Sequence, residues 1–280
     1  MVSKGASKPQ VAPYVKVGPG ICSPFFDERT GLLQALDSQT GDVLVVQDDR
    51  TVSKASNTGG SPTGATLSKE GMLYIADQAH GAVVTVDQGG EPHVVVRVYE
   101  DMAFHGPHSC CVDGSSNLFF TDPGPLGETG LHNPAGSVYC ISKQVLKPLA
   151  LKTLAYPGGI ACSQDGRVVY VAEQAANRVL RFVQRPNGVW YHSVWHQFSG
   201  RFGPSCLELD EEGETIYVGH SDFADLQSGP GLVSVLGAGG LLQMEIEVPG
   251  PEVTGLCLSK DGHTLYVAEA ATQTMYRCAV

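Results

Sequence analysis

A repeated pattern of short strands constrains the fold of this chain more than any other feature of its sequence. In the copy spanning residues 156–182, an apolar segment (159–163) leads into the turn Asp165-Gly166, and a segment rich in Val and Tyr (167–173) follows. A polar turn and a third segment with alternating apolar residues complete the copy. Runs rich in Val, Ile and Tyr that are separated by Gly, Asn and Asp are typical of antiparallel strands. The pattern therefore predicts an antiparallel meander.

The same pattern occurs six times along the chain. Its acidic-glycine turns lie about forty to fifty residues apart, which is the period of β-propeller blades. We therefore predict an all-β, six-bladed β-propeller with four-stranded antiparallel blades and very little helix. The turn glycines of the six copies are Gly31, Gly71, Gly114, Gly166, Gly213 and Gly262.

An acidic residue recurs at one position of the repeat, at the end of the second strand. Asp side chains commonly bond backbone groups of adjacent turns. We therefore predict that these acids are structural and bond neighbouring backbone. They are Asp37, Asp77, Asp122, Glu173 and Glu269.

The two ends of the chain predict how the ring closes. The last repeat contains only three strand segments, at residues 254–259, 264–269 and 274–280. The N-terminal part offers one unassigned strand, residues 11–17. We predict that this N-terminal strand completes the last blade, because the pairing removes sheet edges that would otherwise be open.

The composition bounds the number of domains and the class of partner. We predict a polar tail at residues 1–10 and a single propeller domain at residues 11–280, because no linker interrupts the repeats. The formal net charge of −11, without a cluster of Lys and Arg, argues against nucleic acid as a partner. No apolar run approaches the roughly twenty residues that span a membrane. These features favour the cytoplasm, with the mitochondrion as the alternative because the first 26 residues hold three Lys and no acid.

The eight cysteines have no Cys-x-x-Cys spacing, and most lie inside predicted strands. A small apolar side chain fits such positions, and the absence of a signal-peptide core favours a reducing compartment. We therefore expect reduced, structural thiols and neither disulfides nor a metal cluster.

Two segments resemble the regucalcin, gluconolactonase and strictosidine-synthase-like group of six-bladed propellers. Residues 157–182 resemble that group's Pro-Asn-Gly strand, acidic-glycine turn and Tyr-Val-Ala-acid strand, and residues 118–141 resemble its Phe-Thr-Asp-Pro strand and Gly-x-Val-Tyr strand. The resemblance covers essentially the whole chain. It implies a divalent cation, usually calcium or zinc, held at the starts of four innermost strands by a Glu, two Asn and an Asp. In the reaction that the resemblance implies, the metal polarises a lactone and the Asp acts as general base.

This chain departs from that ligand pattern. When the six repeats are aligned, Cys22 stands for the Glu with Pro24 retained, His108 and Gly158 stand for the two Asn, and Ser205 stands for the Asp. None of these is a carboxylate, and thiol and imidazole are softer ligands than a calcium site requires. We therefore expect a diverged member that lacks the family's metal site. The six predicted channel-lining residues are Cys22, Thr63, His108, Gly158, Ser205 and Thr254.

A different site could replace the lost one. Cys22 and His108 are candidate zinc ligands, with a third ligand from His105, His132 or His220, although a polar channel lining without metal is the commoner situation. The resulting expectation is no cofactor, with a divalent metal (calcium or zinc) as the alternative.

A His-Asp pair near a serine suggests a second replacement. His220 and Asp222 near Ser205 resemble a hydrolase triad, and a hydrogen-bonded pair at a strand end is the alternative. The catalytic candidates are therefore His105, His108, Ser205, His220 and Asp222.

Three functions follow from these observations. The loss of the oxygen ligands in a chain with strong repeats predicts a diverged, non-catalytic lactonase-like propeller. Such a protein would act as a protein-binding or scaffolding subunit through the propeller faces or the N-terminal tail. The first alternative is a metal-dependent hydrolase of small lactones or esters, with a rearranged channel site around Cys22, His105, His108 and residues 128–132. The second is a non-catalytic binder of a small molecule in the channel.

Overall fold

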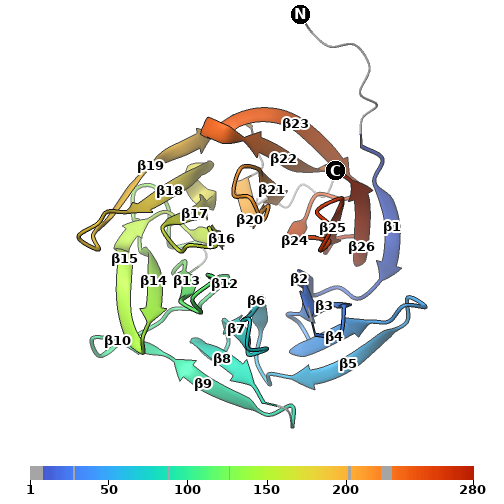
Figure 1. Cartoon of the computed structure of the whole chain (residues 1–280), viewed down its shortest axis with the longest axis horizontal. Helices are drawn as coiled ribbons and strands as arrows, with labels where there is room; N and C mark the ends of the chain where they lie inside the picture. The colour runs from blue at the N-terminus through green and yellow to red at the C-terminus, as the bar shows by residue number, and fades with distance from the viewer. Residues whose placement is uncertain (1–8, 28, 88, 126, 201–202, 222–228) are drawn as a thin grey trace, which may run out of the picture.

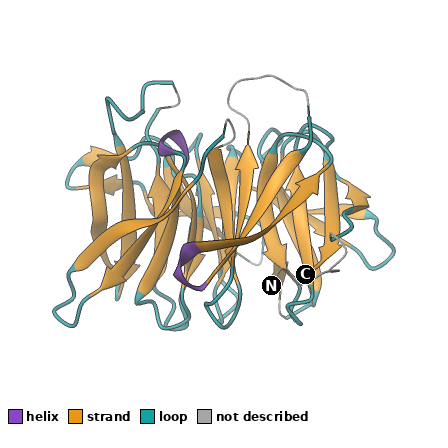
Figure 2. Cartoon of the chain, turned by 90° about the horizontal axis from the view of Figure 1, so that it is seen from above, coloured by secondary structure: helices purple, strands orange, loops and turns teal. Residues whose placement is uncertain are grey.

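The structure, a computed structural model, describes most of the chain. The described residues are 9–27, 29–87, 89–125, 127–200, 203–221 and 229–280. They form six four-stranded antiparallel sheets, arranged as blades around a central axis (Figure 1). Seen edge-on, the strands run between the two faces of a disc, and the connecting loops gather at these faces (Figure 2). The prediction of an all-β, six-bladed propeller is confirmed.

The first three blades follow one another in the sequence, and within each blade the chain runs from the innermost strand to the outermost. Blade 1 contains β2 (Ile21–Asp27), β3 (Leu32–Asp37), β4 (Asp42–Val46) and β5 (Val52–Asn57). Blade 2 contains β6 (Pro62–Leu67), β7 (Leu73–Asp77), β8 (Ala82–Val86) and β9 (Pro92–Val96). Blade 3 contains β12 (Cys110–Val112), β13 (Leu118–Asp122), β14 (Gly136–Ser142) and β15 (Val145–Leu154).

The other three blades have the same arrangement, with the innermost strand first. Blade 4 contains β16 (Pro157–Cys162), β17 (Val168–Glu173), β18 (Arg178–Gln184) and β19 (Trp190–Gln197). Blade 5 contains β20 (Gly203–Leu209), β21 (Ile216–Ser221), β22 (Gly231–Gly237) and β23 (Leu241–Val248). Blade 6 contains β24 (Val253–Leu258), β25 (Thr264–Glu269), β26 (Thr274–Ala279) and β1 (Ala12–Lys16).

The remaining elements are short. A hairpin of β10 (Val98–Tyr99) and β11 (Met102–Ala103) precedes blade 3, and two 3-10 turns occupy η1 (Gln174–Ala176) and η2 (Ala238–Gly240). The described part of the chain contains no α-helix, as predicted. Nor does it contain a helix whose length and apolar character would allow it to cross a membrane.

The N-terminal strand closes the ring. β1 pairs antiparallel with β26, with Ala12 opposite Arg277, and the two strands lie side by side at the outer edge of blade 6 (Figure 1). The ring of Tyr14 packs edge-on against Tyr266 at 5.2 Å, and the guanidinium carbon of Arg277 lies 5.5 Å from the centre of the Tyr14 ring. The predicted closure is therefore confirmed, and aromatic and cation-π contacts add to the strand pairing.

Apolar residues between facing sheets form the core. Val233 and Ile246 of blade 5 pack with Val253 and Leu265 of blade 6, and all four are fully buried. The innermost strands come closest together, and small residues allow this approach. A Cβ at Gly159 of β16 would lie 2.7 Å from the Cα of Cys206 on β20, so only glycine fits there without displacing the neighbouring strand.

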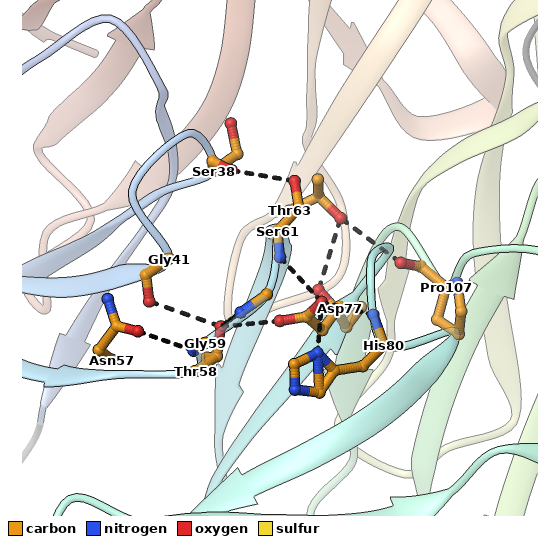
Figure 3. A network of polar contacts seen from close by, with 12 residues as sticks. Ser38, Gly41, Asn57, Thr58, Gly59, Ser61, Thr63, Asp77, His80 and Pro107 are labelled. Carbon is orange, nitrogen blue, oxygen red and sulfur yellow. Dashed lines mark hydrogen bonds and ion pairs between the residues drawn. The ribbon is translucent and has the colours of Figure 1, made fainter.

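A buried carboxylate ends the second strand in five blades and holds the adjacent turns. In blade 2, Asp77 Oδ1 accepts backbone hydrogen bonds from Ser61 (2.9 Å) and His80 (3.1 Å). Its Oδ2 accepts the hydroxyl of Thr58 (2.7 Å), which places the carboxylate at the centre of the network in Figure 3. The prediction that these acids bond neighbouring backbone is confirmed for all five. They are Asp37, Asp77, Asp122, Glu173 and Glu269.

Candidate functional site

A cavity of about 340 Å³ lies at the centre of the ring and is lined by all six innermost strands. Each innermost strand contributes several residues to the lining. Most of the lining is apolar, hydroxyl or thiol. Among the described lining residues, the side chains that ionise as Lys or carboxylate are Lys69, which is exposed, and Glu208, which is partly buried.

The predicted channel residues divide into two groups. Thr63, His108 and Ser205 line the cavity, and so does Thr254. Cys22 lies outside the lining because it is buried in the apolar core shared by blades 1 and 2. Gly158 also lies outside it, and a Cβ added there would meet the carbonyl oxygen of Ser205 at 3.1 Å.

The hydroxyls at these positions point to the neighbouring blade. Thr63 Oγ1 donates to the carbonyl of His108 at 2.8 Å and lies within 3.5 Å of the Pro107 carbonyl (Figure 3). Ser205 Oγ donates to the Val253 carbonyl at 2.7 Å.

Two further residues continue this pattern. Thr254 Oγ1 donates to the Ile21 carbonyl at 2.6 Å, which joins blade 6 to blade 1. The Cys22 thiol donates to the Pro62 carbonyl at 3.5 Å. Four of the six aligned positions therefore use their side chains to join adjacent blades.

Burial keeps the two candidate zinc ligands in their neutral forms. Burial, with a further contribution from the charge of Asp37, raises the pKa of the Cys22 thiol to about 12. Burial lowers the pKa of His108, whose ring lies 6.3 Å from that of Tyr156. His108 Nδ1 is buried and has no hydrogen-bond partner among the described residues. At neutral pH, Cys22 is therefore a thiol and His108 an uncharged imidazole.

Two residues of the suggested triad, Ser205 and His220, bond different partners. Ser205 donates its hydroxyl to a backbone carbonyl, whereas His220 Nε2 lies 3.0 Å from the hydroxyl of Ser234. His220 pairs with Pro204 in blade 5, and Glu173 pairs with Pro157 at the equivalent position of blade 4. His220 therefore occupies the position that a carboxylate holds in the other blades. Asp222 lies outside the described residues.

The other histidine candidates lie on exposed loops. His105 donates its backbone N–H to Asp122 Oδ1 at 3.0 Å, and its side chain is exposed. Glu128 and His132, in the loop proposed to contribute to a rearranged site, are also exposed.

Glu208 on β20 is the one ionisable carboxyl among the described lining residues, and the sequence pattern did not reveal it. Its Oε1 accepts the backbone N–H of Leu258 on β24 at 2.9 Å. Burial raises its pKa to about 7. Comparing the six repeats strand by strand could have found it, because Glu208 lies at the repeat position occupied elsewhere by uncharged residues. These are Phe25, Thr66, Cys111, Ala161 and Cys257.

Residues 22–271 match the family described as "SMP-30/Gluconolactonase/LRE-like region". The chain belongs to this family. Lactonase drp35 of Staphylococcus aureus (strain USA300) is 24% identical over 240 residues, which cover 80% of this chain and 68% of that protein.

Solved structures of the SMP-30/gluconolactonase family share the fold of this chain. A gluconolactonase from Xanthomonas campestris superposes with a TM-score of 0.80 at 19% identity and covers 97% of this chain and 89% of its own. Regucalcin from Agrobacterium tumefaciens, described as a calcium-binding protein, has a TM-score of 0.75 at 18% identity and covers 95% of both chains. The predicted family resemblance is therefore confirmed.

The donor set of this family member does not fit the cation that the resemblance implies. Calcium takes several oxygen ligands, usually with carboxylates among them. In this chain Cys22 is a buried thiol, Gly158 has no side chain, and Ser205 donates its proton to a carbonyl. The described residues contain no group of three or more His, Cys, Asp or Glu that could hold a metal ion. No metal-dependent step can be assigned to this channel.

Proposed function

We propose that this chain is a lactonase-family propeller that no longer uses metal-dependent hydrolysis and functions by binding a protein partner, in the cytoplasm. One observation carries the first half of the proposal. Cys22 and Ser205, which stand at two of the four positions where the family resemblance implies metal ligands, donate to carbonyls of neighbouring blades. Thr63 and Thr254, at the equivalent positions of two other blades, do the same. These side chains stabilise the ring, and their donor chemistry does not suit a hard cation.

An apolar area on the outer edge of blades 4 and 5 supports the second half. We give the name rim patch to five exposed apolar residues on the outermost strands of these two blades, namely Tyr191, Val194, Leu241, Leu242 and Met244. These side chains are 42–71% exposed. They lie on β19 and β23, the outermost strands of adjacent blades (Figure 1). Exposed apolar patches of this kind commonly mark interaction sites.

The two strands of the rim patch are joined. His196 Nδ1 lies 2.8 Å from the carbonyl oxygen of Gly240, which precedes β23. β19 and β23 are also the outer edge strands of their sheets, so the backbone groups on their outer sides can pair with a strand of another protein. This combination supports an apolar, extended segment of another protein as the partner. The propeller faces and the tail at residues 1–10 remain predicted partner sites in this proposal.

Metal analysis and an activity screen test the loss of catalysis. Purified full-length protein is assayed for bound calcium, zinc and manganese, and then for hydrolysis of small lactones with each metal added, with a family gluconolactonase as the positive control. We expect substoichiometric metal and no turnover above buffer. Stoichiometric metal together with turnover would overturn the non-catalytic proposal.

A pull-down from native lysate tests the partner. We expect the wild-type chain to recover a protein that Leu241→Glu at the rim patch does not recover. Val145→Glu, on the outer strand of blade 3, is the matched control because Val145 is also exposed (51%). Recovery of the same protein by all three chains would exclude the rim patch, and recovery of no protein would contradict partner binding.

A metal-dependent lactone or ester hydrolase remains the second candidate function. The similarity to the lactonases and the central cavity favour it. It predicts the opposite result in the metal and lactone assays, so the same experiment separates the two functions.

A further inference from the structure

We propose that the central cavity binds a small organic amine, whose ammonium group pairs with Glu208. Binding in the channel is independent of the protein partner proposed for the rim. Glu208 lies on β20, three residues beyond Ser205 and therefore roughly 10 Å further along the strand.

One carboxylate oxygen of Glu208 is held and the other is free. Oε1 accepts the N–H of Leu258 from the neighbouring blade at 2.9 Å, which orients the side chain. Oε2 has no hydrogen bond or ion pair with any residue that the structure describes. Because Glu208 lines the cavity, Oε2 is available to a ligand there.

No buried residue in the described part of the chain offers Glu208 a counter-charge at neutral pH. The titratable groups that face it are Cys206 on its own strand, Cys257 on β24 and Tyr217 on β21. Burial raises the pKa of all three, that of Cys206 to about 12, so they are uncharged. Lys69 also lines the cavity, but it is exposed and solvent screens its charge. A bound cation would therefore supply the positive partner charge that the surrounding groups do not provide for the Glu208 carboxylate.

The cavity limits the class of ligand. Its volume of about 340 Å³ falls at the small end of ligand sites in proteins. Ile160, Leu207 and Leu256 contribute apolar atoms to its wall. A single carboxylate cannot make a metal site, and no group of three donors exists among the described residues. A compact amine with an apolar body matches both the carboxylate and the wall.

Titration calorimetry with benzylamine tests the proposal, and benzyl alcohol serves as the uncharged probe of similar shape. We expect full-length protein to bind benzylamine and not benzyl alcohol. Burial raises the pKa of Glu208 to about 7, so the ionised fraction rises between pH 6 and pH 8. Affinity for the cation should therefore increase about tenfold over this range.

Two variants separate binding by Glu208 from a general effect. Glu208→Gln keeps an oxygen that can accept the Leu258 N–H and removes the charge, so we expect at least a tenfold loss of affinity and no remaining pH dependence. Glu212→Gln, an exposed acid in the same blade, is the matched control and should bind like the wild type.

Proton release provides a measurement on the wild type alone. At pH 6 most of the cavity carboxyl is protonated, so binding of a cationic amine should release close to one proton, detected by repeating the calorimetry in buffers of different ionisation enthalpy. Equal binding of benzyl alcohol, equal binding by Glu208→Gln, absence of proton release, or no binding of benzylamine at millimolar concentration would each overturn the proposal.

Discussion

Replacing Glu208 by Gln should stabilise the protein, and increasingly so as the pH rises. Burial raises the pKa of this carboxyl from 4.5 to about 7. Between these two pH values the folded state keeps a proton that the unfolded state has lost. The stability that comes from keeping Glu208 protonated is therefore fully present below pH 4.5 and is lost as the pH rises to about 7. The amide of Gln is neutral throughout and does not take part in this titration.

The size of the effect follows from the pKa difference. Each pH unit is worth about 1.4 kcal/mol, so complete ionisation of Glu208 costs the folded state at most about 3.5 kcal/mol. Because the side chain reaches the cavity and is only partly buried, we expect about 1–2 kcal/mol. The free energies of unfolding of the two proteins should therefore diverge by this amount between pH 5 and pH 8.

Urea unfolding of both proteins at several pH values, followed by tryptophan fluorescence, measures this divergence. All other titrating groups are common to the two chains, so the difference isolates Glu208. Glu212→Gln should follow the wild type at every pH. Parallel pH profiles for wild type and Glu208→Gln would show that the carboxyl titrates normally and would refute the reasoning.

Three other predictions follow from the blade contacts. Thr254→Val removes the hydroxyl that links blade 6 to blade 1, and we expect a loss of about 1 kcal/mol in urea unfolding, with no loss contradicting a structural role. Deleting residues 1–17 removes β1 and exposes the edge of β26, so thermal unfolding should shift down by many degrees, and an unchanged transition would argue against closure by this strand. Burial raises the pKa of the Cys22 and Cys206 thiols to about 12. Labelling of folded protein with a disulfide reagent at pH 7 should therefore be slow at both, and rapid labelling would contradict the raised pKa of these thiols.

The blade repeat and its closure can be predicted from the sequence because both depend on local patterns. The predicted strand at residues 264–269 forms β25 with the same bounds. The predicted strand at residues 11–17 forms β1, which is one residue shorter at each end. The structural role of acids such as Asp77 is predictable because the bonds they make lie within one turn or between adjacent loops.

The site is predictable only in part. Alignment of the repeats locates Thr63, Ser205 and Thr254, which line the cavity. It also names Cys22, whose side chain packs in the apolar core shared by blades 1 and 2 and is not among the residues that line this cavity. Alignment of the repeats shows that Glu208 is the one acid at its repeat position, but it does not show that this position faces an enclosed cavity and not solvent.

Periodicity and residue type are enough to give the number of blades, the order of strands and the residues at the positions where the family resemblance implies metal ligands. Both are local properties of the chain. Only the assembled ring decides which carbonyl accepts the hydroxyl of Ser205 and how far the carboxyl of Glu208 is shielded from water. They depend on neighbours about fifty residues away, such as Leu258 for Glu208 and Val253 for Ser205, which the ring brings within hydrogen-bond distance.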